Sequence, residues 1–430
     1  MDREMTSNSC KRTDSRGRRR ARQLGRAIFS ALILPVMLVA CDDLLTVEVP
    51  GAASEADLDN PGLARTLVVA ALGEFECSFV QYAATAGILT REFESASGFR
   101  ATNIWNSRLE SLDEVMGSCP GSRTADSFGY WAPMQTARFL ADDAYERLTA
   151  FPSDQVPNLE RKLGDVSTYG GFSYLLLGEG YCEMAADGGP LLSRQDVFGI
   201  AENRFTQGIG HAQAAGDNNL LQAAHVGRAR ARLYQGDLAG AASDARQVSE
   251  GFVRDVNFTS TQVRRENRWV NLTYTVERLT VGPDYLDLTV NGEPDVRVPV
   301  EDTGGPGEDA VTHFYQQQKY TSHGQNIPLA SWVEAQLIIA EAEGGSSAVE
   351  ALNNVRAHFG LPAYTGDGSL EDVIEERRRT FFMEGQRLND MLRFDIPFPS
   401  GTNNKGDPYG PTTCIPLPLN ERLNNPNIPN

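Results

Sequence analysis

Adjacent carboxylates are the residues of this sequence that most directly suggest catalysis. Asp142-Asp143 and Glu375-Glu376 are two such pairs, and two carboxylates that face each other across a sugar can hydrolyse a glycosidic bond. Each pair is more simply explained as a solvated helix face or as part of an ion pair between packed helices. The sequence also contains no G-x-S-x-G, H-E-x-x-H or P-loop motif. We therefore expect that the protein is not an enzyme and uses no cofactor.

The five histidines offer little prospect of a metal site, because only His313 and His323 are near each other in the sequence. The stretch "TGDGS" around Asp367 is more typical of a turn than of a calcium-binding loop. We therefore expect no bound metal.

An uncharged run from Ala27 to Ala40 follows nine basic residues and ends in Leu-Val-Ala before Cys41. Its 14 residues are too few to span a bilayer, which takes about 20, and the basic stretch before it is typical of a secretory signal. Small residues before a cysteine favour a bacterial lipoprotein cleavage site. We therefore predict a signal peptide over residues 1–40 and a lipid on Cys41. The alternative is an ordinary signal peptide followed by an incidental cysteine.

The mature chain is strongly acidic. Residues 1–40 hold 9 of the 39 Lys and Arg residues and 3 of the 57 Asp and Glu residues, which leaves 30 against 54 and a net charge of −24. Phosphates and anionic lipids would repel such a protein, and this excludes nucleic acid as a partner. Attachment to a membrane then depends on the lipid or on a protein partner.

Four cysteines follow Cys41, and an even number in an exported protein suggests disulfide bonds. Three pairings are possible. We predict Cys77–Cys119, because both residues lie in the N-terminal helical region, and Cys182–Cys414. The alternative is four buried free thiols. The sequence has no C-x-x-C pair, which argues against a zinc ribbon.

Helical periodicity dominates residues 41–251. Residues 170–192 predict one helix that ends at the sequence Asp-Gly-Gly-Pro. Residues 220–252 predict two helices joined at Gly236, with small residues spaced as in a tetratricopeptide repeat, at Ala229, Gly236, Ala241 and Ala245. One such repeat cannot bury its own face, so several are expected to stack. A generic alanine-rich helical hairpin is the alternative.

Residues 252–330 break the helical pattern. The stretch "WVNLTYTV" alternates as a strand does, and Asn291-Gly292 joins two alternating runs as in a hairpin. We expect a β-rich insertion here. Helices are expected to resume over residues 331–430, one of them starting at a capping pair of Ser369 and Asp372, before an extended tail.

Six short motifs mark the C-terminal third of the sequence. They are Ala340-Glu341-Ala342, Leu352-Asn353-Asn354-Val355-Arg356, Glu376-Arg377-Arg378, Glu384-Gly385-Gln386-Arg387, Ile415-Pro416 and Asn425-Pro426-Asn427. Together they resemble the SusD/RagB family of lipoproteins. In that family a helix ending in Ala-Glu-Ala leads to Leu-Asn-x-Val-Arg, a Glu-Arg-Arg helix with Glu-Gly-x-Arg follows, and the chain ends near Ile-Pro and Asn-Pro-Asn.

This resemblance implies a mainly α fold: a tetratricopeptide-like helical repeat scaffold with a loop- and β-hairpin-rich insertion. It also implies a lipoprotein of the outer membrane, exposed at the cell surface, that binds an oligosaccharide or a peptide as a nutrient. The implied partner is a SusC-type TonB-dependent transporter that receives the nutrient. The alternative function is a lipid-anchored helical-repeat scaffold for protein assembly.

Binding residues in the family come from loops after the early helices and from the insertion, and sugars stack on aromatic rings beside hydrogen-bonding groups. The resemblance therefore implies ligand-binding residues at Asn103, Trp105, Arg108 and Trp269. The alternative is that the two rings pack the insertion onto the scaffold. Glu384 and Arg387 are expected to form a buried structural ion pair rather than to contact the ligand.

Overall fold

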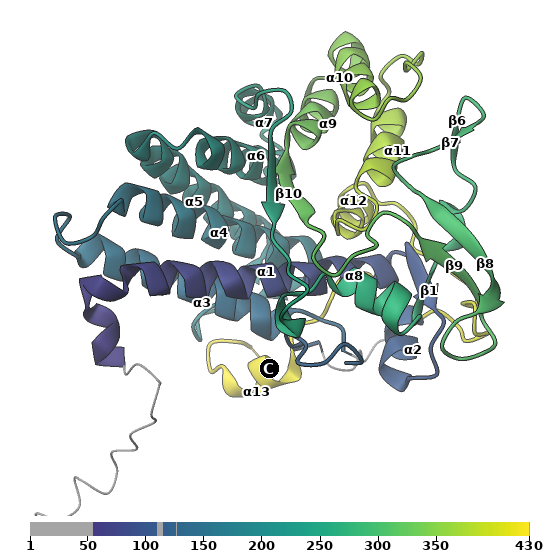
Figure 1. Cartoon of the computed structure of the whole chain (residues 1–430), viewed down its shortest axis with the longest axis horizontal. Coiled ribbons are helices and arrows are strands. Elements are labelled where there is room, and N and C mark those ends of the chain that lie inside the picture. The colour runs from purple at the N-terminus through teal and green to yellow at the C-terminus, as the bar shows by residue number, and fades with distance from the viewer. Residues whose placement is uncertain (1–54, 110–114, 126, 430) are drawn as a thin grey trace, which may run out of the picture. The chain divides into compact units, whose positions relative to one another are not determined.

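The computed structural model describes residues 55–109, 115–125 and 127–429, so the predicted signal peptide and Cys41 lie outside the described residues. From residue 55 onward the chain forms one compact unit. Most of it is a series of helices in which each packs on its neighbours in the chain (Figure 1). The helices of this array are α1 (Ala64–Leu89), α3 (Trp131–Ala150), α4 (Leu159–Gly180), α5 (Arg194–Ala215), α6 (Asn218–Gln235), α7 (Leu238–Ala245), α9 (Trp332–Glu343) and α10 (Gly345–His358).

The array confirms the predicted mainly α, tetratricopeptide-like scaffold. The turn between α6 and α7 shows how the sequence encodes it. Gly236 adopts a φ of 83°, which a residue without a Cβ tolerates, and it ends α6. Asp237 then caps α7 by accepting a hydrogen bond from the amide of Gly240 at 2.9 Å. The next helix of the array, α9, packs against α7 although about 90 residues separate them, because the insertion lies between.

Shorter helices and two-stranded sheets complete the fold. The helices are α2 (Arg100–Asn106), α8 (Arg268–Val270), α11 (Leu370–Thr380), α12 (Arg387–Arg393) and α13 (Leu419–Asn424). The antiparallel strand pairs are β1 (Phe93–Ser95) with β5 (Leu279–Val281), β2 (Glu183–Met184) with β3 (Leu192–Ser193), β4 (Val253–Val256) with β10 (Ile327–Ser331), β6 (Thr289–Val290) with β7 (Glu293–Pro294), and β8 (Val300–Pro306) with β9 (His313–Gln317).

Two local predictions are confirmed. Asn291 and Gly292 both have positive φ, and they form the turn of the β6–β7 hairpin. Ser369 accepts a hydrogen bond from the amide of Asp372 and caps α11. In the C-terminal tail α13 forms one short helix, so the tail is not extended throughout.

Two other local predictions are wrong. The stretch "WVNLTYTV" is not a strand, because Trp269 lies in α8 and a wide helical turn occupies Asn271–Thr275. Asn267 starts this turn by accepting a hydrogen bond from the amide of Trp269 at 3.1 Å, and the residues on both sides of the alternating pattern are buried. The helix predicted over residues 170–192 ends at Gly180, where the tail pairs with the backbone of Tyr181 through Ile415.

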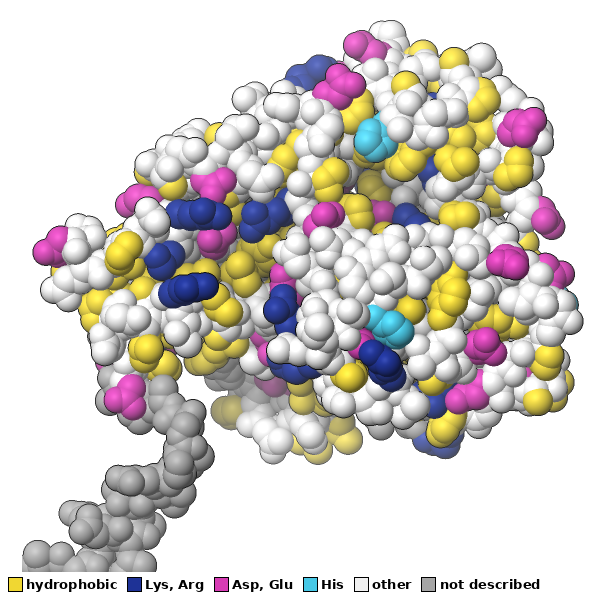
Figure 2. All heavy atoms as spheres, in the orientation of Figure 1, with side chains coloured by type: hydrophobic (Ala, Val, Ile, Leu, Met, Phe, Trp, Pro, Cys, Tyr) yellow, Lys and Arg dark blue, Asp and Glu magenta, His cyan; other side chains and the backbone are white. Residues whose placement is uncertain are grey.

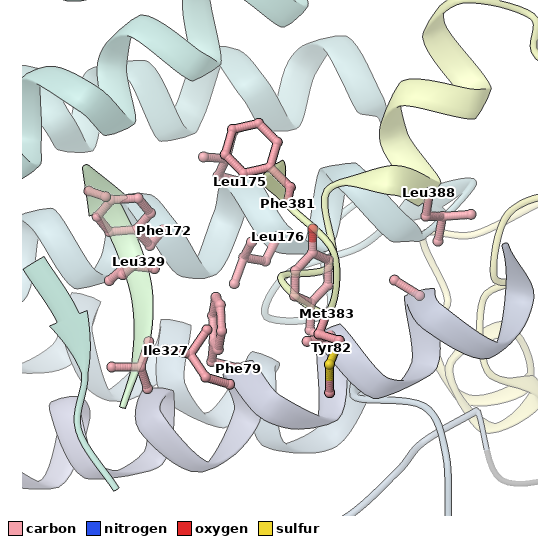
Figure 3. Packing of buried hydrophobic residues seen from close by; sticks show 14 of the residues in the cluster. Phe79, Tyr82, Phe172, Leu175, Leu176, Ile327, Leu329, Phe381, Met383 and Leu388 are labelled. Atoms are coloured by element: carbon pink, nitrogen blue, oxygen red, sulfur yellow. The ribbon is translucent and has the colours of Figure 1, made fainter. Parts of the chain in front are cut away.

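The core is shared by the helices and the insertion. Figure 3 shows Phe79 and Tyr82 of α1 with Phe172 of α4, Leu329 of β10 and Met383, which follows α11 in the chain. All five side chains belong to one buried cluster. The insertion is therefore packed into the same core as the scaffold.

Two disulfide bonds confirm the predicted pairing. Cys77 of α1 is bonded to Cys119, and Cys182 is bonded to Cys414, which lies 232 residues later in the chain. The second bond ties the tail to the end of α4. Among the described residues, no helix is long and apolar enough to cross a membrane.

Candidate functional site

A cavity of about 600 Å³ lies between the insertion and a C-terminal loop. Strands β1, β5 and β9 contribute one side of it, and the segment between β8 and β9 contributes another. The residues that carry polar groups into its lining are Glu94, Thr280, Asp309, Thr312, His313, Tyr315, Asn404 and Lys405. The volume falls within the usual range for small-molecule sites in proteins.

Thr280 holds the strands of this wall together. Glu94 of β1 and Thr280 of β5 are paired across the β1–β5 ladder. The Thr280 hydroxyl accepts a hydrogen bond from the amide of Tyr315 at 2.8 Å and donates one to the carbonyl of His313 at 3.2 Å. These bonds fix β9 beside β5, and with it the two rings that β9 brings to the cavity.

The rings of His313 and Tyr315 form the aromatic part of the site. Their centroids are 4.8 Å apart, and the planes are tilted by 59°. His313 is exposed, and its Nε2 lies 2.6 Å from Oδ1 of Asp302. Tyr315 is half-buried and packs against the core with its inner side. An aromatic ring that is anchored on one side and open on the other suits the apolar face of a sugar.

Another part of the lining comes from residues near the C-terminus. The Asn404 side chain donates a hydrogen bond to the carbonyl of Ser95 at 2.7 Å and accepts one from Nδ2 of Asn106 at 3.0 Å. Lys405 forms an ion pair with Asp309 and donates to Oγ1 of Thr312 at 2.9 Å. Partial burial lowers the pKa of Lys405.

The charges that line the cavity are paired. Glu94 accepts a hydrogen bond from Nε of Arg91 at 2.9 Å, and Asp309 is paired with Lys405. The lining therefore offers hydrogen-bonding groups without an excess of one charge. Such an arrangement favours a neutral, hydroxyl-rich ligand over a strongly ionic one.

The two predicted tryptophans are buried in the core. Trp105 and Trp269 are both 0% exposed. The Trp105 ring lies 6.1 Å from that of Phe128, whereas Trp269 lies 4.7 Å from Phe93 and donates its indole hydrogen to the carbonyl of Met383 at 2.9 Å. In this structure both rings pack the insertion and the loops onto the scaffold, as the alternative interpretation expects. A role of either ring in ligand binding stays a prediction.

The other two predicted residues hold loops that border the cavity. Asn103 accepts a hydrogen bond from the Ser95 hydroxyl at 2.7 Å and donates to the carbonyl of Ser97 at 3.2 Å. Arg108 is buried, and its guanidinium lies 4.9 Å from the ring centroid of Tyr409 while it donates to backbone carbonyls of the C-terminal loop. The hydrogen bonds of Asn103 and Arg108 therefore hold loops beside the cavity in place. Direct contact of either residue with a ligand stays a prediction.

None of the residues that line the cavity was predicted from the sequence as a binding residue, and this includes His313, Tyr315, Asn404 and Lys405. The alternation around "HFYQQ" is the one local signal, because it places His313 and Tyr315 on the same face of a strand. No local pattern indicates that residues 404 and 405 meet a strand near residue 94. That contact arises from the tertiary fold.

The predicted ion pair between Glu384 and Arg387 is wrong. Glu384 is paired instead with Lys319 of the insertion, at 2.9 Å. Gly385 has a φ of 86°, which lets the chain change direction between Glu384 and the start of α12 at Arg387. Nη1 of Arg387 is buried without a hydrogen-bond partner within the described part of the chain.

The adjacent carboxylates lie in ion pairs and hydrogen bonds. Asp142 is 2.9 Å from Arg204 and accepts from the Tyr174 hydroxyl at 2.8 Å, and Glu376 contacts Arg297 and Arg356 at 2.5 Å each. Within residues 55–109, 115–125 and 127–429, no three His, Cys, Asp or Glu side chains are grouped closely enough to hold a metal ion.

Comparisons with known proteins point to one family. Residues 254–413 match the model of the SusD family. A laminarin-binding SusD-like protein is similar in structure, with a TM-score of 0.62 and 17% identity over 86% of this chain and 98% of that one. A SusD-like protein from Bacteroides fragilis gives a TM-score of 0.65 and 14% identity over 89% of this chain and 99% of the other.

A third similar structure contains a ligand. Surface glycan-binding protein A from Bacteroides thetaiotaomicron, in complex with laminarihexaose, gives a TM-score of 0.56 and 13% identity over 78% of this chain and 90% of that one. At these identities the structural matches establish the fold. No curated protein matches the sequence.

Proposed function

This chain belongs to the SusD family, and on that premise we propose that it binds a neutral glycan in the cavity between β5, β9 and residues 404–405. The observation that carries this proposal is the combination in one cavity of about 600 Å³ of an anchored aromatic ring, Tyr315, with charge-paired polar groups. Similar structures include proteins that are described as binding laminarin or laminarihexaose.

Electrostatics support a neutral ligand. The mature chain carries a net charge of −24, counted from the predicted cleavage at Cys41. Glu94 and Asp309 already form ion pairs within the protein, with Arg91 and Lys405 respectively. A uronic acid or sulfated sugar would therefore meet repulsion and no free cation in the lining.

The proposal includes where the protein acts. A signal peptide over residues 1–40 and a lipid on Cys41 would place it at the surface of an outer membrane, as the Leu-Val-Ala-Cys sequence suggests. There it would deliver its ligand to a SusC-type TonB-dependent transporter. It would bind the glycan without cleaving it.

Calorimetry on the mature protein tests the binding step. We expect laminarihexaose, or another neutral oligosaccharide from a panel, to bind, and an oligogalacturonate to bind at least tenfold more weakly. Tyr315→Ala is expected to weaken binding by about 1–3 kcal/mol, because it removes the stacking surface. Phe139→Ala is the matched control, since Phe139 is an exposed ring on α3, away from the cavity lining.

Three outcomes would contradict parts of the proposal. Chromatography of the recovered ligand that showed shortened products would overturn the assignment as a binding protein. Binding of peptides but of no glycan would shift the ligand to the peptide class. Binding of neither, together with recovery of protein partners through the helical array, would favour the assembly scaffold.

A further inference from the structure

A second cavity, of about 320 Å³, opens on another part of the molecule. It lies between β10, the start of α9, the end of α11 and the loop after β9, and it shares no lining residue with the glycan cavity. Figure 2 shows a recess on this face, between the elements labelled α9, α11 and β10 in Figure 1, where hydrophobic and charged side chains both reach the surface.

Apolar side chains make up most of its walls and its mouth. Val333, Phe359 and Phe381 line the interior. Val253 and Val296 also line it and are 41% and 58% exposed. Apolar side chains that remain exposed at the mouth of a concave site lose contact with water when a ligand covers them, which favours binding.

Lys319 and Glu384 form an ion pair in the wall of this cavity, and their opposite charges cancel. The Lys319 ammonium has three acceptors, which are Oε1 of Glu384 at 2.9 Å and the carbonyls of Phe382 and Thr380 at 2.8 and 3.2 Å. All three of its donors are therefore used. Lys319 offers nothing to an anionic ligand, and it would repel a cationic one that approached Glu384.

One carboxylate oxygen of the wall remains open to a ligand. Oε1 of Glu384 is paired with Lys319, whereas Oε2 takes no hydrogen bond from any residue that the structure describes. The Glu384 side chain is 11% exposed, so a ligand hydroxyl can approach Oε2 and donate a hydrogen bond to it. The Tyr320 hydroxyl, by contrast, is fully enclosed and lies out of reach of a ligand in the cavity.

We propose that this cavity is a second binding site, for a small neutral ligand that combines an apolar ring with one hydroxyl group. The ring fills the space between Val333 and Phe381. The hydroxyl donates a hydrogen bond to Oε2 of Glu384. The site is independent of the glycan cavity, so each can be occupied while the other is empty.

Three aromatic probes of similar size test the chemistry. Titration of the mature protein, followed by ligand-observed NMR, is expected to show binding of p-cresol. Toluene lacks the hydroxyl and is expected to bind at least fivefold more weakly, and benzoate, an anion, is expected not to bind. Equal affinities for p-cresol and toluene, or no binding of p-cresol at millimolar concentration, would overturn the proposal.

Three variants locate the site. Glu384→Gln keeps the shape of the side chain and an oxygen for Lys319 but removes the second carboxylate oxygen, so it is expected to lower the affinity for p-cresol at least threefold. Tyr320→Phe is the matched control and is expected to leave that affinity unchanged, because its hydroxyl is enclosed. Val296→Trp places a large ring at the exposed mouth and is expected to abolish binding of p-cresol. Unchanged p-cresol affinity in the folded Val296→Trp variant would overturn the location. Laminarihexaose titration of the same variant is expected to match the wild type, which separates this test from that of the glycan cavity.

Discussion

The side-chain amide of Asn404 donates a hydrogen bond to the backbone carbonyl of Ser95, 309 residues earlier in the chain, at 2.7 Å. With the bond that it accepts from Asn106, it joins the C-terminal loop to the segment that follows α1. The glycan cavity exists because these two distant segments meet.

Asn404→Ala is therefore expected to open one wall of the cavity. The loss of two hydrogen bonds is expected to lower the free energy of unfolding by about 1–2 kcal/mol and to weaken glycan binding. Asn427→Ala is a suitable control, because Asn427 is an exposed asparagine that donates to a backbone carbonyl outside the cavity lining, that of Gly188 at 2.7 Å. Urea denaturation and calorimetry measure the two effects. Glycan affinity equal to that of the control would show that the loop is not needed for binding.

Trp269→Ala is expected to lower the free energy of unfolding by about 3–5 kcal/mol, because it removes a fully buried ring and its hydrogen bond to Met383. Trp332→Ala is expected to cost less, since Trp332 is only partly buried. Denaturant titration of both variants measures this difference. If Trp269→Ala instead weakened glycan binding and left stability unchanged, Trp269 would be a ligand contact in a conformation other than this one.

The buried carboxyl of Glu92 is expected to make stability fall as the pH rises. Burial raises its pKa to about 7, although the amide of Met383 donates a hydrogen bond to it at 3.2 Å. Below about pH 4.3, the pKa of an exposed glutamate, Glu92 is protonated in both states. Between that pH and about 7 the folded state keeps the proton and the unfolded state loses it, so nearly 4 kcal/mol of stability is lost across the whole window, at about 1.4 kcal/mol per pKa unit.

Glu92→Gln isolates this contribution, because glutamine keeps an oxygen that accepts from Met383 and does not titrate. Urea denaturation of both proteins at pH 4.5 and pH 7.5 gives the difference in unfolding free energy between them. This difference is expected to move by about 3 kcal/mol in favour of Glu92→Gln at the higher pH. A difference that is the same at both values would show that Glu92 does not titrate in this range.

Removal of the long-range disulfide is expected to destabilise the protein. Cys182→Ser combined with Cys414→Ser frees a loop closed over 232 residues, and the expected loss is about 2–4 kcal/mol. Thermal and chemical denaturation without reductant measure it. Peptide mapping under non-reducing conditions is the direct check of connectivity, and a Cys77–Cys182 link would contradict it.

Cys41 is expected to carry the lipid anchor. Metabolic labelling with a palmitate analogue should label the wild-type protein and not Cys41→Ser, and only the wild type should fractionate with membranes. Labelling of both proteins to the same extent would contradict a lipoprotein signal at this position.

Local signals in the sequence predicted the elements that local interactions determine. Gly236 with Asp237, and Asn291 with Gly292, are turns whose backbone angles their own residue types favour. The stretch around Trp269 was predicted incorrectly because tertiary burial covers both of its faces, and an alternating pattern then no longer separates a strand from a helical turn.

The glycan cavity was beyond sequence analysis for a related reason. Its walls come from segments near residues 94, 280, 313 and 404, and no periodicity links them. The tryptophans drew attention because large rings are good stacking surfaces, yet large rings are also what a core buries most favourably. Only the fold distinguishes these two uses of the same residue type.

The two ends of the insertion are neighbours in space, since Val256 of β4 is paired with Ile327 of β10. The chain between them leaves the scaffold and returns to it at one place. Its hairpins, β6–β7 and β8–β9, are largely exposed and can change in length or sequence without altering the path of the helical array. Trp269 and Leu279 of the same segment lie in the shared core and do not have this freedom. Selection for a new nutrient can therefore act on the two hairpins, while the core, the helical array and the disulfides stay the same.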